Sequence, residues 1–199
     1  MAAYVSLREP PEKRRNSCSD SKEKHLTEAA VMIAFAIHLL DAGANRVEVH
    51  PDGEHAKQFD IRGCLESLGF VFESAKGTTP YGGTYRRRRQ RVTVFPKPGS
   101  GDVTAELGNK LVTAECKGGV TNSTHAGLVA RLRRGICEAV GLLMARPFDG
   151  KSERHVAVVP MTAATKKLAR KMQGRTESAG IEIVLVSDHG QVQFVGKRR

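Results

Sequence analysis

The stretch from Gly101 to Lys117 has the alternating pattern of a β-hairpin, and it constrains the fold more than any other part of the chain. Its return strand has a mainly polar face and an apolar face, made of Leu111, Thr113, Glu115 and Lys117 on one side and Val112, Ala114 and Cys116 on the other. Gly108-Asn109 suits a two-residue turn between the strands. With that turn, the pairing places Asp102 directly across from Glu115.

Two acidic residues that face each other on a sheet repel, so a sequence with this arrangement indicates a cation that both share. Carboxylate ligands favour Mg²⁺ or Mn²⁺. Lys117 lies two residues beyond Glu115 on the same face, where it could position a water molecule for hydrolysis of a phosphodiester. The alternative is that these side chains form the solvated outer face of an ordinary hairpin.

The order of Asp102, a hairpin and Glu115-Cys116-Lys117, with a helix before it and a long helix after it, resembles the PD-(D/E)xK nuclease superfamily. That superfamily includes restriction endonucleases and archaeal Holliday-junction resolvases, and the resemblance covers roughly residues 54–160. It implies that Asp102 and Glu115 bind Mg²⁺, with Mn²⁺ able to substitute. It also implies that Lys117 is the catalytic lysine and that the carbonyl group of Cys116 is a backbone ligand. Gly101 stands where the family often has proline.

Nucleases of this superfamily commonly add an acidic or amide side chain from the helix before the sheet. Matching the Gly69-Phe70 end of an expected helix at residues 54–68 to the resolvase pattern puts Gln58 at that position. An amide oxygen can coordinate a hard cation without adding charge. Three acidic residues remain alternatives for this role, namely Glu28, Glu54 and Glu66.

The charge balance favours a polyanionic partner, because 32 Lys and Arg residues face 21 Asp and Glu residues, for a net charge of +11. Nucleic acid is the leading candidate, with DNA preferred over RNA. The densest positive charge lies in an expected strand at residues 84–95 and consists of Arg86, Arg87, Arg88, Arg89 and Arg91. Beside a metal site, these arginines would hold backbone phosphates without reading sequence. The alternative is a strand whose arginines only face water.

The rest of the chain alternates helical and strand patterns, which predicts an α/β fold with one mixed sheet flanked by helices, restriction endonuclease-like according to the resemblance. Helices are expected from Thr27 to about Gly43, at 54–68, after a cap at Ser123 or Thr124, and at 162–178. Strands are expected at 46–50, 70–72, 84–95, 155–161, 181–186 and 191–195. Residues 1–24 are expected to be a flexible polar and basic arm, 25–196 a single nuclease-like domain, and 197–199 a basic tail.

No stretch approaches the roughly 18 apolar residues of a membrane span, so the sequence predicts no membrane partner. The four cysteines are scattered without a Cys-x-x-Cys pair, and the first residues are polar and charged. This pattern favours neither a disulfide framework nor a zinc site and predicts a reducing, cytoplasmic location.

The resulting hypothesis is a Mg²⁺-dependent endonuclease that hydrolyses DNA. The alternative is a non-catalytic nucleic-acid-binding protein with the same fold. Within the enzyme class, a junction resolvase and a restriction or repair endonuclease remain open. A homodimer would suit concerted cutting of two strands, since that reaction needs two symmetric sites.

Overall fold

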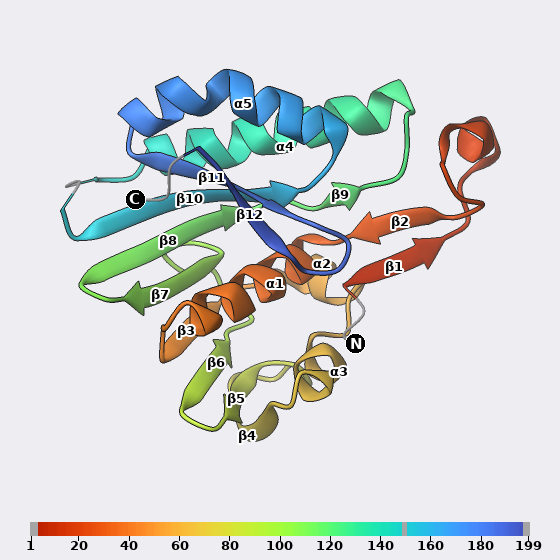
Figure 1. Cartoon of the computed structure of the whole chain (residues 1–199). Coiled ribbons are helices and arrows are strands. Elements are labelled where there is room, and N and C mark those ends of the chain that lie inside the picture. Colours follow the sequence, from red (N-terminus) through yellow and green to blue (C-terminus); the bar gives the residue numbers. More distant parts are fainter. Residues whose placement is uncertain (1–3, 149–150, 197–199) are drawn as a thin grey trace.

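The computed structural model describes residues 4–148 and 151–196, and it shows a mixed α/β architecture (Figure 1). The large sheet has nine strands in the order β12 (Val192–Val195), β11 (Ile181–Val186), β10 (Glu153–Pro160), β8 (Lys110–Cys116), β7 (Val103–Leu107), β3 (Arg46–Val49), β6 (Gln90–Val94), β5 (Gly83–Arg87) and β4 (Val71–Ala75). A second sheet has the order β1 (Val5–Arg8), β2 (Glu23–Leu26) and β9 (Gly119–Val120). The α/β class predicted from the sequence is confirmed.

The helices are α1 (Glu28–Asp41), α2 (Gly53–Ala56), α3 (Ile61–Ser67), α4 (Ala126–Met144) and α5 (Ala163–Ser178), with a 3-10 helix η1 (Glu12–Ser17). Alternate residues of β10 point to opposite faces of the large sheet, as strand geometry requires. Val156 and Val158 pack in the core that contains α1, whereas Ala157 and Val159 pack against α4 and α5. The large sheet is therefore covered by helices on both faces in its central part.

The hairpin predicted at residues 102–117 is confirmed, including its register. Leu107 pairs with Lys110 and Val103 pairs with Ala114. The same register, continued by one residue, places Asp102 opposite Glu115. Gly108 takes the first turn position with a φ of 63°, a conformation that glycine adopts without steric cost. The return strand β8 then runs parallel to β10 in the middle of the sheet.

The prediction of a flexible arm at residues 1–24 is wrong for its described part, residues 4–24. Residues 5–26 form β1, η1 and β2, and β2 pairs with β9, which follows the hairpin directly in sequence. Leu26 is fully buried in the core, which anchors this segment to the rest of the protein. The predicted basic tail at 197–199 lies outside the described residues.

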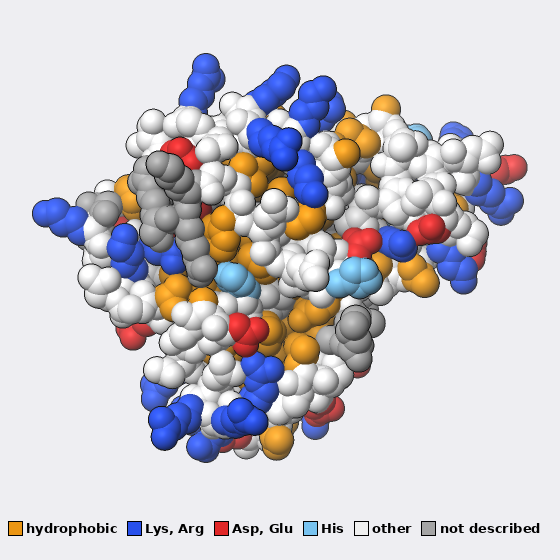
Figure 2. All heavy atoms as spheres, in the orientation of Figure 1, with side chains coloured by type: hydrophobic (Ala, Val, Ile, Leu, Met, Phe, Trp, Pro, Cys, Tyr) orange, Lys and Arg blue, Asp and Glu red, His pale blue; other side chains and the backbone are white. Residues whose placement is uncertain are grey.

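Two elements near the hairpin differ from the sequence expectation. The helix expected at 54–68 is divided into α2 and α3, because the Asp60 side chain accepts a hydrogen bond from the Gly63 amide and starts a new helix there. The strand expected at 84–95 is a hairpin of β5 and β6, with Arg88 in the turn at a φ of 57°. Blue side chains gather over these two strands at the bottom of Figure 2.

Three other helix starts follow capping chemistry. Helices α1 and α5 start where predicted, with Thr27 and Thr162 as their caps, and each threonine oxygen accepts a backbone amide hydrogen bond. The cap of α4 is His125, one residue beyond the predicted Ser123 or Thr124, and its Nδ1 accepts from the Gly127 amide. The strands predicted near 155–161, 181–186 and 191–195 are confirmed as β10, β11 and β12.

Candidate metal and hydrolytic site

The carboxyl end of β8 holds the acidic residues that the hairpin pattern predicted. The Asp102 amide donates to the Ala114 carbonyl oxygen at 2.9 Å, and Asp102 Oδ2 accepts from the Cys116 amide at 2.7 Å. The Lys117 amide donates to the Val158 carbonyl oxygen of β10 at 2.9 Å. Both ends of the site are thus fixed by backbone hydrogen bonds of the central sheet.

Glu115 lies in this site with only 7% of its side chain exposed. Arg146, which follows the end of α4, forms an ion pair with Glu115 Oε1. A guanidinium group therefore neutralises a carboxylate that the sequence assigned to a metal. The sequence contains no signal for this contact, because 31 residues separate the two partners.

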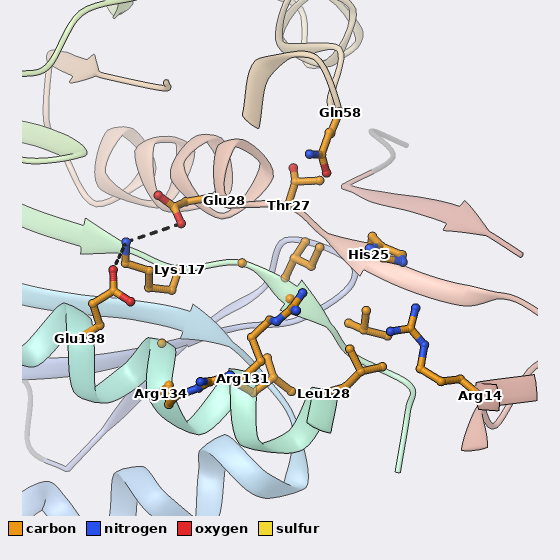
Figure 3. Close-up of a pocket in the computed structure, with 16 residues that line it drawn as sticks. Arg14, His25, Thr27, Glu28, Gln58, Lys117, Leu128, Arg131, Arg134 and Glu138 are labelled. Atoms are coloured by element: carbon orange, nitrogen blue, oxygen red, sulfur yellow. Dashed lines mark ion pairs between the residues drawn. The ribbon is translucent and has the colours of Figure 1, made fainter. Parts of the chain in front are cut away.

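Lys117 lies between two acidic residues from different helices (Figure 3). Its Nζ is 3.7 Å from Glu28 Oε2 of α1 and 3.0 Å from Glu138 Oε1 of α4. Gly118 makes the approach of α1 possible, since a Cβ atom at this position would lie 2.4 Å from the Glu28 amide nitrogen. The sequence Glu-Cys-Lys-Gly thus brings the first turn of α1 against the end of β8.

Burial dominates the electrostatics of the site. It raises the pKa of Asp102 to about 7, and the nearby Glu115 and Glu28 carboxylates act in the same direction. Burial also raises the pKa of Glu28 to about 7, although Lys117 opposes this shift. Partial burial would lower the pKa of Lys117, but its ion pairs with Glu138 and Glu28 raise that pKa above its ordinary value. Lys117 is therefore positively charged at neutral pH.

The donor chemistry of the site fits a hard divalent cation. Asp102 and Glu115 provide carboxylate oxygens, and a third oxygen could come from the Cys116 carbonyl group, as the resemblance implies. Within the described part of the chain, no group of three or more His, Cys, Asp or Glu side chains is arranged as a metal site. The proposed site has only two acidic side chains and one backbone carbonyl group, so it would not count as a group of three side chains. Burial raises the pKa of Asp102 to about 7, so the pocket disfavours the ionised form of this carboxyl group, which a bound cation would favour.

The four candidates for the upstream ligand are in different places. Glu28 lies beside Lys117, with 14% of its side chain exposed. Gln58 follows α2 in a turn, and its Oε1 accepts a hydrogen bond from Arg8 of β1 at 3.1 Å. Glu54 and Glu66 pair with Lys57 and Arg62 on exposed surfaces. Of these residues, only Glu28 contacts another residue of the predicted site, and α1 provides it in place of the segment at 54–68.

Cys116 is fully buried and belongs to the hydrophobic core, as its position on the apolar face of β8 predicted. Burial raises the pKa of its thiol well above the ordinary value. The thiol is therefore protonated, and only backbone groups of this residue face the chemistry of the site.

The arginine hairpin, which we define as Arg86, Arg87, Arg88, Arg89 and Arg91, does not lie beside this site. Arg91 of β6 lies beside Arg46, the first residue of β3, in the parallel ladder of these two strands. The Asp102 carbonyl oxygen, in contrast, accepts a hydrogen bond from the amide of His50, just after the end of β3. The two regions are therefore at opposite ends of the sheet, and the expected contact between arginines and metal site is wrong. A role of the arginine hairpin in binding nucleic acid stays a prediction.

Several of these arginines have partners within the chain. Arg86 and Arg91 both pair with Glu73, at 3.3 and 3.6 Å. Arg87 pairs with Asp41 at 3.3 Å, and its guanidinium group lies over the Phe70 ring, 4.6 Å from the centroid. Intramolecular pairs of this kind explain how like charges are tolerated in such a short segment.

Comparison with known proteins gives no match: no protein-family model, no curated protein and no solved structure matches the chain. Among the residues described, no helix combines the length and the apolar character that crossing a membrane requires.

Proposed function

We propose that this protein is a Mg²⁺-dependent endonuclease that hydrolyses DNA phosphodiester bonds. The observation that carries the proposal is the convergence of Asp102, Glu115 and Lys117 at the end of β8, with Glu28 as a fourth member from α1. A pair of acids with a lysine two residues beyond the second acid is the arrangement of the PD-(D/E)xK nucleases that the sequence resembles. Mn²⁺ is expected to replace Mg²⁺, because both prefer oxygen ligands.

The residues divide the work by their chemistry. Asp102 and Glu115 would hold the cation, which when bound would polarise the scissile phosphate and lower the pKa of water. Lys117 cannot act as a base while it is charged, so it would orient the attacking water and stabilise the negative charge that develops on the phosphate. Glu28 and Glu138 fix the position of its ammonium group.

A non-catalytic nucleic-acid-binding protein is the second candidate, and the net charge of +11 favours a polyanionic partner in either case. The raised pKa values of Asp102 and Glu28 favour the enzyme. Acidic residues buried close together lower the stability of the protein and weaken its attraction for DNA, so a protein that only binds DNA gains nothing from them. The four cysteines are free, which agrees with our proposal of a cytoplasmic location. A homodimer is proposed only for concerted cutting of two strands.

The test is incubation of the purified protein with supercoiled plasmid, linear duplex, single-stranded DNA, RNA and a four-way junction, with Mg²⁺ or with EDTA. We expect cleavage of at least one DNA substrate with Mg²⁺, none with EDTA, and none by Asp102→Asn or Lys117→Ala. Full cleavage by both variants would exclude this site. Binding of DNA without cleavage of any substrate would favour the non-catalytic alternative.

A further inference from the structure

A groove of about 640 Å³ leads away from Lys117 and Glu28 (Figure 3). One wall is α4 and the other is formed by the small sheet and η1, so the groove depends on the N-terminal segment that the sequence pattern predicted to be flexible. Leu26, Val120, Leu128 and Leu132 also line the groove, and each of them is at most 6% exposed. Gly118 and Gly119 add backbone without side chains close to Lys117.

Two arginines of α4, Arg131 and Arg134, line the groove. They are three residues apart, so they lie on the same side of the helix. Both are exposed, and neither forms an ion pair with any residue of the described chain. Their positive charge is thus open to an external anion, unlike that of Arg86, Arg87 and Arg91 in the arginine hairpin.

The positions along α4 give these arginines an order relative to Lys117. Glu138, which contacts Lys117, is four residues after Arg134 and seven after Arg131. The two arginines therefore lie about 6 and 10 Å from Glu138 along the helix axis. They form a row of positive charge that leads toward Lys117 and Glu28.

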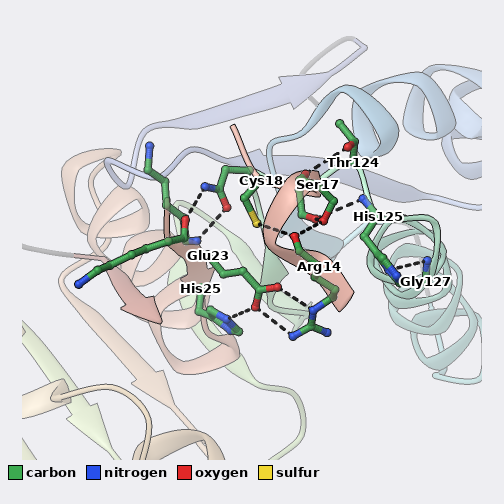
Figure 4. A network of polar contacts seen from close by, with 12 residues as sticks. Arg14, Ser17, Cys18, Glu23, His25, Thr124, His125 and Gly127 are labelled. Carbon is green, nitrogen blue, oxygen red and sulfur yellow. Dashed lines mark hydrogen bonds and ion pairs between the residues drawn. The ribbon is translucent and has the colours of Figure 1, made fainter. Parts of the chain in front are cut away.

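Arg14 stands at the far end of the groove from Lys117 (Figure 3) and is held by a polar network (Figure 4). Its Nε is 2.8 Å from Glu23 Oε1, and Glu23 is almost completely buried. His25 Nε2 lies 3.0 Å from the other Glu23 oxygen. These contacts fix the small sheet and η1 as a defined wall opposite α4.

We propose that this groove binds the phosphodiester backbone of one nucleic-acid strand and guides it to Lys117, with Arg131 and Arg134 as the phosphate contacts. The inference deepens the proposed function and rests on it for the identity of the strand. A long groove with two arginines spaced along one wall suits a strand, because neighbouring phosphates of one backbone can lie on the two guanidinium groups.

The matched control is Arg133. It lies on the same helix between the two groove arginines and is also exposed, but it does not line the groove. Arg131→Ala, Arg134→Ala and their combination should therefore be compared with Arg133→Ala. All three positions are exposed, and thermal unfolding of each variant verifies that the fold is kept.

The experiment measures anisotropy of labelled single-stranded DNA, single-stranded RNA and duplex DNA over a salt series, with Ca²⁺ in place of Mg²⁺ to prevent cleavage. For a single strand, we expect the combined Arg131 and Arg134 variant to bind about tenfold more weakly and its salt slope to fall by about 1.4, because each lost phosphate contact removes about 0.7. Arg133→Ala should bind within about twofold of wild type. The affinities for the three nucleic acids show which of them the groove binds most tightly.

Equal losses in Arg133→Ala and the groove variants would overturn the proposal, since binding would then depend only on net charge. An unchanged salt slope in the groove variants would also overturn it, even if the wild type cleaves DNA. Equally tight, groove-dependent binding of polyglutamate would assign the groove to an acidic protein instead. Groove-dependent binding of nucleic acid by a protein that cleaves no substrate would support the groove and reject the nuclease.

Discussion

The acidic site at the end of β8 and the arginine hairpin of β5 and β6 are both dense in charge, but the structure treats them in opposite ways. The acidic site gathers buried and half-buried side chains from α1, the hairpin of β7 and β8, and the segment just after α4. The arginine hairpin consists of neighbours in sequence, most of which pair with exposed acids nearby. Two regions that looked equally functional in sequence therefore differ in burial.

This difference has a consequence for function. Charges at the acidic site lie in a poorly solvated pocket, where each interaction is strong and an unbalanced carboxylate is costly. Charges on the arginine hairpin are screened by water and salt, so single pairs contribute little. We therefore expect large effects of substitution at the acidic site and small effects at the arginine hairpin.

The largest contrast is expected in cleavage. Lys117→Ala should lower the rate at least about 100-fold, because it removes a positive charge aimed at the reacting phosphate. Replacing Arg88 and Arg89 together with alanine should change the rate less than about threefold, since these exposed turn residues are at the other end of the sheet. The assay is plasmid cleavage with Mg²⁺ at saturating DNA. A larger loss in the arginine variant would reverse the comparison.

Substitution of Glu28, the candidate upstream residue, should have the next largest effect on cleavage. Glu28→Gln should reduce cleavage about 10- to 100-fold, because Glu28 helps to fix Lys117. Gln58→Ala should stay within a few-fold of wild type, as its amide oxygen is bound to Arg8. Glu73→Gln, which removes the shared carboxylate of the arginine hairpin, serves as the control. Strong loss in Gln58→Ala with an active Glu28→Gln would return the ligand role to Gln58.

The sequence predicted the hairpin and its facing acids because strand alternation and turn chemistry are local properties. The same holds for the capped helices α1 and α5. Arg146 and the small sheet were missed, since their contacts join segments far apart in the chain. Arg131 and Arg134 carried a weak signal, because these arginines, three residues apart, lie close to the apolar positions Leu128 and Leu132 on the same helix. Only the fold shows that this side of α4 lines a groove.

Ion pairs of the two regions should differ in stability. Arg146→Gln leaves Glu115 buried without its cation, which should lower the free energy of unfolding by about 3 kcal/mol without metal. Arg87→Gln should lower it by less than about 1 kcal/mol, since Asp41 is 61% exposed. Urea unfolding with and without Ca²⁺ checks both values. Added Ca²⁺ should raise the free energy of unfolding of Arg146→Gln more than that of wild type. An equal increase in both proteins would place the cation elsewhere.

The pH dependence of stability should also separate the two regions. The pKa of Asp102 is raised to about 7 in the folded protein, so folding favours the protonated form. Its contribution is present at low pH and is lost as the pH rises from about 4 to about 7. Asp102→Asn should therefore raise the melting temperature at pH 8 by a few degrees and flatten its fall with pH. Asp41→Asn, at the exposed partner of Arg87, should leave the pH profile unchanged.

The central claim is that Asp102 and Glu115 form a divalent-cation site, and direct titration of Mn²⁺ followed by electron paramagnetic resonance tests it most simply. The variants are Asp102→Asn and Glu115→Gln, and the control is Glu106→Gln, an exposed acid on the same hairpin. We predict saturable Mn²⁺ binding to wild type and Glu106→Gln, and loss of that binding in both site variants. Equal binding by all four proteins, or none by wild type with DNA present, would contradict the account.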